Sequence, residues 1–270
     1  MNHPDAHFSA SIASLYQAHM VPMLFEPYAT DLVTRVLGRP CARVLEVAAG
    51  TGVVTRHLAQ RLPDHTAITA TDLNPAMLEL ARSLGTARPV VWQVADAMQL
   101  PFGDGAFDAV VCQFGAMFFP DKAKAFAEAH RVLSPGGALF FSVWDRIEKN
   151  EFAETVIDAL ASAFPLDPPR FIARVPHGYF DLQAIARDLA QGGFTAPLHT
   201  HTVVSRSHAA SARIAAEALC QGTPLRAEIE ARDIGGLEAA TAMAEAALAY
   251  RFGSGPIDGR MQAHVITAAR

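Results

Sequence analysis

Short apolar runs alternate with amphipathic segments over residues 41–145. The run Ala42–Val47 is rich in β-branched residues and ends at a glycine turn, which is typical of a buried strand. Val53–Leu62 then has helical spacing and stops before Pro63. The alternation continues with strands predicted at Ala67–Thr71, Val90–Val94, Phe107–Cys112 and Ala138–Val143, and helices at Pro75–Arg82 and Lys122–Leu133. Strands that alternate with helices predict a parallel sheet covered on both faces.

The flanking segments have a different pattern. Residues 1–40 predict a helical cap, with a break near Pro22 and Pro27. Beyond Trp144, helical spacing covers 146–180 and the alanine-rich interval 208–251, and two further strands are predicted at 196–204 and 261–269. We therefore expect a single domain over 1–270 with a doubly wound, Rossmann-like α/β fold. Its mostly parallel seven-stranded sheet has helices on both faces, and 146–180 and 208–251 form a helical lid beside the core 41–145.

Composition narrows the class of ligand. The formal net charge is −5, and no basic stretch is present to meet a nucleic acid, so a small molecule is favoured. Three widely spaced cysteines show no ligand spacing, which predicts buried free thiols and neither a disulfide framework nor a metal site. No signal-peptide pattern or long apolar run occurs. We expect a cytoplasmic protein. The sequence leaves open whether it forms a homodimer.

The glycine turn after the first strand is the strongest candidate for a ligand site. Glycines at 50 and 52 allow a tight turn and a close approach of a ligand to the backbone. Asp72 stands twenty residues after Gly52, at the end of the second strand. In a doubly wound sheet, its carboxylate lies beside the turn and can accept hydrogen bonds from ribose hydroxyls.

Two residues separate this turn from a dinucleotide-binding motif. Thr55 replaces the third glycine of G-x-G-x-x-G, and Glu46 precedes the turn with a carboxylate that would repel a pyrophosphate. Glu46 suits a ligand with an ammonium and a sulfonium group, and S-adenosylmethionine has both. An NAD(P)-dependent oxidoreductase and a non-catalytic S-adenosylmethionine-binding protein stay open as alternatives.

Four segments carry a resemblance to a family. VLEVAAGTG, ITATDLNPAML, VADAMQLPFGDGAFDAVVCQFGAMFF and HRVLSPGGALFFSVW resemble, in order and spacing, class I S-adenosylmethionine-dependent methyltransferases, with the nearest likeness to the UbiE-like or type 11 group. The resemblance implies methyl transfer to oxygen, carbon or nitrogen of a small molecule, with S-adenosyl-L-methionine as cofactor and S-adenosyl-L-homocysteine as product. A quinone precursor or another hydrophobic metabolite would suit such an enzyme.

The resemblance also implies roles for individual residues. Glu46 would meet the methionine amino group, Asp72 the ribose and Asp96 the adenine amino group. Ala48, at a position where the family often has glycine, belongs to the turn. The other implied cofactor-binding residues are Tyr16, Gly50, Thr51, Gly52, Leu73, Met77, Ala97, Met98, Gln113 and Phe114. Leu73 and Met77 could instead be core residues.

Methyl transfer to a nucleophile is an in-line displacement at an activated carbon, so positioning can replace a dedicated acid or base. An acceptor that must lose a proton could use His177, in the segment expected to cover the site. The alternative for His177 is a hydrogen bond to the backbone. Trp144, Asp145 and Arg146 follow the fifth strand and could line an acceptor pocket.

Overall fold

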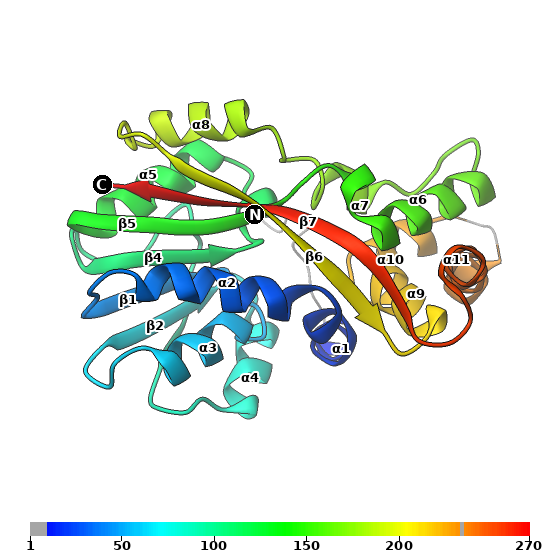
Figure 1. The fold of residues 1–270 in the computed structure, drawn as a ribbon, viewed down its shortest axis with the longest axis horizontal. Helices are drawn as coiled ribbons and strands as arrows, with labels where there is room; N and C mark the ends of the chain where they lie inside the picture. The colour runs from blue at the N-terminus through cyan, green and yellow to red at the C-terminus, as the bar shows by residue number, and fades with distance from the viewer. Residues whose placement is uncertain (1–9, 233–234) are drawn as a thin grey trace. The chain divides into compact units, whose positions relative to one another are not determined.

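The computed structural model describes residues 10–232 and 235–270 and contains a seven-stranded sheet in the order β3-β2-β1-β4-β5-β7-β6 (Figure 1). Strands β1 to β5 pair in parallel, and β7 pairs antiparallel with β5. The strands are β1 Arg43–Val47, β2 Ala67–Asp72, β3 Val91–Val94, β4 Phe107–Gln113, β5 Leu133–Trp144, β6 His199–Ala209 and β7 Ile257–Ala269. The predicted Rossmann-like, mostly parallel seven-stranded fold is confirmed.

The described residues divide into two compact units. One contains Pro27–Trp144, Tyr179–Val203 and Ala263–Arg270, and the other contains the described part of Met1–Glu26 with Asp145–Gly178 and Val204–Gln262. We call them the core unit and the helical unit. Strands β6 and β7 have residues in both.

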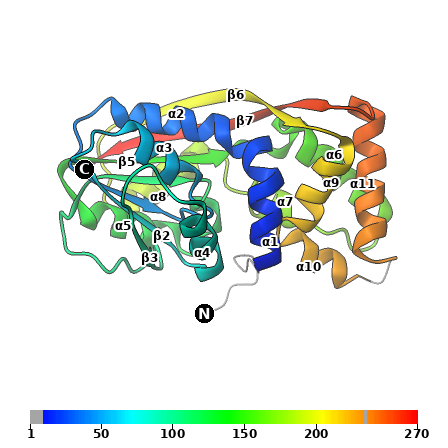
Figure 2. The same ribbon diagram turned by 90° about the horizontal axis from the view of Figure 1, so that it is seen from below.

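The core unit is built on the strands β1 to β5. Its helices are α2 Glu26–Leu37, α3 Val53–Arg61, α4 Pro75–Leu84, α5 Lys122–Val132 and α8 Leu182–Gln191. Right-handed crossovers place α3 and α5 on opposite faces of the sheet, and α8 packs on α5 (Figure 2). Strand β1 has four consecutive buried residues, as expected for a strand covered on both faces.

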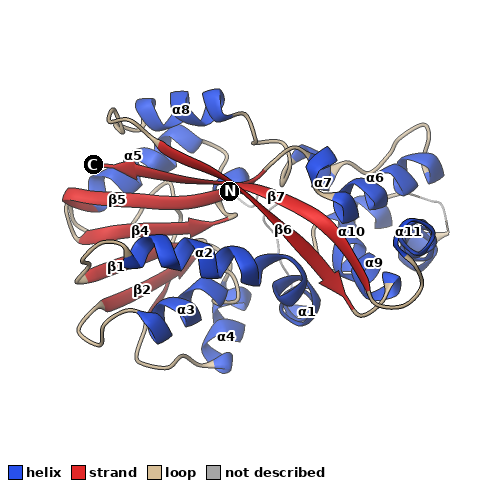
Figure 3. Ribbon diagram, viewed as in Figure 1, coloured by secondary structure: helices blue, strands red, loops and turns tan. Residues whose placement is uncertain are grey.

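The helical unit accounts for the segments after Trp144 that the sequence predicted as helical (Figure 3). Its helices are α1 Ala10–Leu15, α6 Glu151–Ala163, α7 Phe171–Arg174, α9 Ala212–Gln221, α10 Leu225–Glu230 and α11 Gly236–Phe252. The interval predicted at 208–251 begins later than expected, because β6 continues to Ala209. Residues 1–9 of the predicted cap and 233–234 of the predicted lid lie outside the described residues.

The predicted break near Pro22 and Pro27 is wrong. Helical structure continues from Ala10 to Leu37, and Pro22 lies inside a π-helix over Tyr16–Phe25. A proline lacks the N–H that an α-helical turn requires, and the wider winding accommodates that loss. Pro27 lies in the first turn of α2, where the missing N–H costs little.

Two further observations bear on the sequence predictions. All three cysteines are free and buried, as expected. Among the described residues, no helix has the length and apolar character needed to cross a membrane.

Asp108 joins the amino-terminal ends of β1 and β4. Its Oδ2 accepts hydrogen bonds from the backbone N–H groups of Ala42 and Arg43, both at 2.9 Å, and its Oδ1 accepts one from the Ser134 hydroxyl. Burial raises the pKa of this carboxyl, but the hydrogen bonds outweigh burial and leave the pKa below its usual value. Asp108 is therefore a structural residue at the edge of the sheet opposite the glycine turn.

We predict that Asp108→Asn lowers the free energy of unfolding at pH 7 by about 1–3 kcal/mol, because a charged acceptor of two backbone amides is lost. A lowered pKa contributes stability above the unfolded pKa, and that contribution disappears as the pH falls. The difference from the wild type should therefore shrink below about pH 4. Denaturant unfolding at pH 7 and pH 3.5 measures both effects.

The matched control is Asp64→Asn, which changes an exposed aspartate of the same unit. It should leave unfolding at pH 7 unchanged. Equal stability of the Asp108 and Asp64 variants would contradict the role given to Asp108.

Candidate functional site

The turn after β1 has an unusual backbone. Ala48, Gly50 and Gly52 have φ values of 55°, 55° and 79°, in the left-handed region. For Ala48 this conformation costs about 1–2 kcal/mol. Gly52 is required sterically as well, since a Cβ there would lie 2.8 Å from the Trp92 ring. Gly115 lies against the same turn, and a Cβ there would lie 2.5 Å from the Ala48 Cβ. The backbone after β1 is therefore held in one strained conformation by its neighbours.

Asp72 is attached directly to this turn. Its Oδ2 accepts a hydrogen bond from the Gly50 N–H at 2.7 Å, and its Oδ1 accepts one from the Asn74 N–H at 2.8 Å. Burial raises the pKa of Asp72, and the backbone hydrogen bonds oppose the rise. The structure thus brings together the aspartate and the glycine turn that the sequence placed side by side, and the ribose role of Asp72 stays a prediction.

Glu46 lies in β1 just before the turn and is 2% exposed. Its Oε2 accepts a hydrogen bond from the hydroxyl of the fully buried Thr55 at 2.5 Å. Burial raises the pKa of Glu46 to about 8, although the Thr55 hydrogen bond and the charge of Arg56 lower it. At neutral pH the carboxyl group is therefore largely protonated in the free protein.

Thr55 contacts the candidate site in a way that the sequence did not indicate. The sequence suggested only that its side chain departs from a dinucleotide-binding motif. In the structure, its hydroxyl donates a hydrogen bond to the carboxyl group of Glu46. The signal that could have identified it is a hydroxyl-bearing residue in the first turn of α3, the helix that follows β1.

Asp96 follows β3 and completes a row of three carboxyl groups. Its Oδ1 accepts a hydrogen bond from the Met98 N–H at 2.8 Å, and the Ala95 N–H donates to the Asp72 carbonyl. Glu46, Asp72 and Asp96 thus lie at or just beyond the carboxyl ends of the adjacent strands β1, β2 and β3, where open parallel sheets bind ligands. Within the described residues, no group of three or more histidine, cysteine or carboxyl side chains could hold a metal ion.

One side chain of the turn is also suited to a ligand. The hydroxyl of Thr51 is buried and has no hydrogen-bond partner among the residues that the structure describes. A buried hydroxyl without a partner is costly, and a polar ligand group would satisfy it. Among the remaining turn-side residues, Met77 is buried and Leu73 is 54% exposed, so the core alternative does not apply to Leu73.

The end of β4 carries an aromatic cluster. Phe114 has a left-handed φ of 52°, and its ring stacks on Trp144 with 3.9 Å between centroids and 8° between planes. Tyr28 contacts both rings edge-on. The structure therefore brings together Phe114, predicted to bind the cofactor, and Trp144, predicted beside the acceptor. Gln113 precedes them at the end of the strand.

His177 and Tyr16 belong to the helical unit. His177 is 6% exposed, and its Nδ1 lies 2.8 Å from the Asp145 carbonyl oxygen. Burial lowers the pKa of this imidazole to about 4, so it is neutral at pH 7. This is the backbone hydrogen bond named as the alternative, and a role as base stays a prediction. The Tyr16 ring stacks on Phe25 with 5.1 Å between centroids.

A polar network surrounds Asp145. The Asp145 carboxylate accepts hydrogen bonds from the Arg146 N–H and from the Gln262 side chain, and the Asn150 side chain donates to the Asp145 carbonyl. Asp145 is 6% exposed. The structure thus joins two predicted residues, Asp145 and His177, through the Asp145 carbonyl.

Comparison with known proteins places the core in a family. The methyltransferase domain family matches residues 45–141. A demethylmenaquinone methyltransferase of Thermus thermophilus is 46% identical over 99 residues, which are 36% of this chain and 44% of that protein. The ubiquinone/menaquinone biosynthesis C-methyltransferase UbiE of Paraburkholderia phymatum is 31% identical over 170 residues, 58% of this chain and 69% of the relative. The chain thus spans less than half the length of the Thermus relative.

A solved structure shows the same fold over a longer stretch. Haemonchus contortus phosphoethanolamine N-methyltransferase 2, in complex with phosphomonomethylethanolamine and S-adenosylhomocysteine, has a TM-score of 0.59 and 17% identity, covering 97% of this chain and 57% of that one. The shared motifs and the UbiE relative agree on one assignment. The chain belongs to the class I S-adenosylmethionine-dependent methyltransferases, in the UbiE-like group.

Proposed function

We propose that this protein transfers a methyl group from S-adenosylmethionine to a small molecule. The observation that carries the proposal is the row of carboxyl groups of Glu46, Asp72 and Asp96 around a glycine turn. A cation beside buried carboxyl groups favours their ionised form, and the ionised groups then stabilise the cation. S-adenosylmethionine carries an ammonium and a sulfonium, whereas a dinucleotide carries a negative pyrophosphate. The arrangement supports the first ligand over the second.

The residues of the turn fit this cofactor. Glu46 would hold the methionine amino group, Asp72 the ribose hydroxyls and Asp96 the adenine amino group. The buried Thr51 hydroxyl offers one further polar contact. When bound, the cofactor supplies a methyl group on a positively charged sulfur. The protein then contributes mainly position and exclusion of water, effects that can lower a barrier by roughly 7–11 kcal/mol.

The acceptor is proposed to be a hydrophobic metabolite with a quinone-precursor-like ring. The relatives named above act, by their names, in menaquinone and ubiquinone biosynthesis. The net charge of −5 supports a small molecule over a nucleic acid. We further propose that residues 1–270 form one methyltransferase domain that works in the cytoplasm. Within it, 146–180 and 208–251 would contribute to acceptor recognition. A homodimer is the assembly that we propose to test.

Asp72→Asn should weaken the binding of S-adenosylhomocysteine by about tenfold or more, because charge-assisted hydrogen bonds to the ribose are lost. Isothermal titration calorimetry measures the affinity, and thermal unfolding checks that the variant is folded. Asp64→Asn is the control and should bind like the wild type.

Three results would each overturn a part of the proposal. Unchanged affinity in a folded Asp72 variant would remove the ribose role. Binding of NAD by the wild type without binding of S-adenosylhomocysteine would favour the oxidoreductase alternative. Binding of the cofactor with no methyl transfer across a panel of quinone-like, phenolic and amine acceptors would favour a non-catalytic binding protein.

The raised pKa of Glu46 predicts that cofactor binding releases a proton. The free carboxyl group titrates near pH 8, and a cationic ligand stabilises its ionised form. Affinity for S-adenosylhomocysteine should therefore increase between pH 6 and 7.5, with release of about one proton at pH 7. Calorimetry in two buffers with different ionisation enthalpies counts the protons.

Variants assign this proton to Glu46. Glu46→Gln should reduce the release and flatten the pH profile. Thr55→Val removes the hydrogen bond that lowers the Glu46 pKa and should move the profile to higher pH, whereas Thr55→Ser should preserve it. A proton count that Glu46→Gln leaves unchanged would contradict the assignment.

A further inference from the structure

The segment 96–104 carries the residues assigned to the adenine but has little regular structure of its own. It follows β3 and contains only a short turn, in which Asp96 accepts hydrogen bonds from the N–H groups of Met98 and Gln99. The turn orients the Asp96 carboxylate relative to Met98 but does not fix where the turn itself lies on the core. Whatever holds the rest of the segment therefore bears on how a base is recognised.

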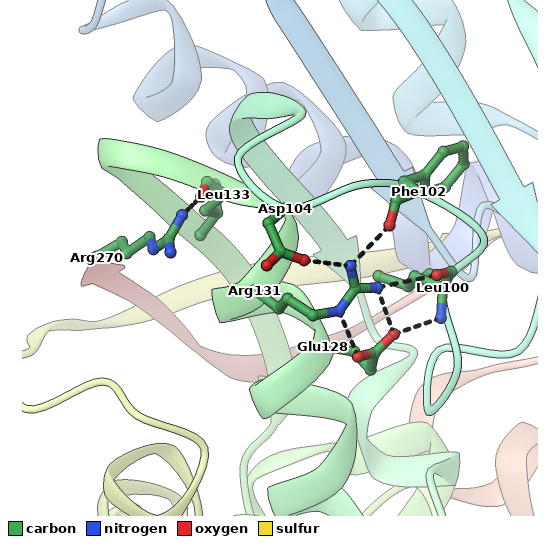
Figure 4. A network of polar contacts seen from close by, with 7 residues as sticks. All are labelled: Leu100, Phe102, Asp104, Glu128, Arg131, Leu133 and Arg270. Atoms are coloured by element: carbon green, nitrogen blue, oxygen red, sulfur yellow. Dashed lines mark hydrogen bonds and ion pairs between the residues drawn. The ribbon is translucent and has the colours of Figure 1, made fainter.

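Arg131, in α5, makes most of the external polar contacts of this segment (Figure 4). Its guanidinium donates to the carbonyl oxygens of Phe102 at 2.7 Å and Leu100 at 3.0 Å, and to the Asp104 carboxylate at 2.9 Å. The Arg131 carbonyl oxygen also accepts a hydrogen bond from the Gly105 N–H. One residue of α5 thus binds the segment at three points and the adjoining Gly105 at a fourth.

Glu128 completes the arrangement from the preceding turn of α5. Its Oε1 and Oε2 accept two hydrogen bonds from the Arg131 guanidinium, at 2.7 and 2.8 Å, and Oε2 also accepts one from the Leu100 N–H at 2.7 Å. The guanidinium holds the pKa of Glu128 below its usual value. We call Glu128 and Arg131 the clip.

The clip requires an arginine. Its planar guanidinium donates five hydrogen bonds, to two carboxylates and two carbonyl oxygens, whereas the ammonium group of a lysine has only three N–H donors. The pair is also partly shielded, because the side chains of Arg131 and Glu128 are 31% and 19% exposed. Shielding makes such charge-assisted hydrogen bonds stronger than those of a fully solvated pair.

Apolar contacts seat the same segment on the core. Ala97 and Leu100 are buried, and they line a small apolar cavity together with Phe126 and Ala129 of α5. Polar contacts with the clip and apolar contacts with Phe126 and Ala129 thus attach the segment to α5. Asp96 lies at the start of the attached stretch.

We propose that the clip positions the segment 96–104 and thereby sets the preference of the site for adenine over other bases. The inference rests on the proposed function, since it assumes that Asp96 meets the adenine amino group. Glu128 and Arg131 are positioning residues that act through the segment, and they need not touch the cofactor.

The test compares two ligands that differ only at the base. S-adenosylhomocysteine has an amino group where S-inosylhomocysteine has an oxygen, so a well-placed Asp96 should give the wild type about a tenfold preference for the first. Arg131→Lys should reduce that preference to about threefold or less, with most of the loss in affinity for S-adenosylhomocysteine. Calorimetry with both ligands provides the ratio, which a general loss of stability would not change selectively.

Arg270→Lys is the matched control, because Arg270 also donates to a backbone carbonyl, that of Leu133, which lies outside 96–104 (Figure 4). It should keep the wild-type preference. Glu128→Gln is the second clip variant, should Arg131→Lys fail to fold, and should also reduce the preference. In either clip variant, hydrogen exchange at the Leu100 amide should become faster.

The outcomes separate the inference from the proposed function. A wild type that binds neither ligand overturns both. A wild type that binds both equally overturns the role of the segment in base recognition while cofactor binding stands. A wild-type preference that survives in a folded Arg131→Lys or Glu128→Gln variant overturns the clip alone.

Discussion

The structure of the candidate site depends on one buried carboxyl group. Glu46 lies buried near the carboxyl end of β1, and desolvation raises the pKa of its carboxyl group to about 8. The Thr55 hydroxyl supplies the hydrogen bond that makes this burial tolerable. The cost of burying the ionised carboxyl group falls beside a positive ligand group, so the proposed site favours a cationic ligand. A pyrophosphate would increase the cost, whereas an ammonium would remove it.

The strained turn after β1 is a consequence of the same arrangement. A strand that ends in a buried carboxyl group must reverse within a few residues if the backbone amides of the following helix are to reach the ligand. Three left-handed residues achieve this, and one of them is an alanine. The alanine is tolerated because the neighbouring Gly115 leaves space for its Cβ. Asp72 then ties the turn to β2 through the Gly50 N–H, so the carboxyl groups and the strained backbone stabilise one conformation together.

The sequence predicted the elements whose residues interact locally or repeat with a clear period. The strands β1 to β5 and the proximity of Asp72 to the glycine turn follow from periodicity and from the topology of parallel sheets. The π-helix around Pro22 did not follow, because a proline indicates a missing hydrogen bond but not how a helix will compensate for it. The clip could not be predicted either. Arg131 contacts backbone carbonyl groups 29 and 31 residues earlier in the chain, and contacts with the backbone leave no pattern of side chains in the sequence. The sequence indicated only that Thr55 replaces a glycine with a larger side chain, whereas its hydroxyl group is what contacts Glu46.

The distribution of similarity follows from the chemistry of methyl transfer. The family match covers residues 45–141, which carry the carboxyl groups, the turn and the clip, while the fold similarity at 17% identity extends over nearly the whole chain. The same activated cofactor presents the same charges and the same base to each enzyme of the family that binds it. An acceptor need only lie in line with the methyl group, and many different side chains can place it there. Asp145 and His177, whose buried network belongs to the helical unit, lie outside the residues that the family match covers.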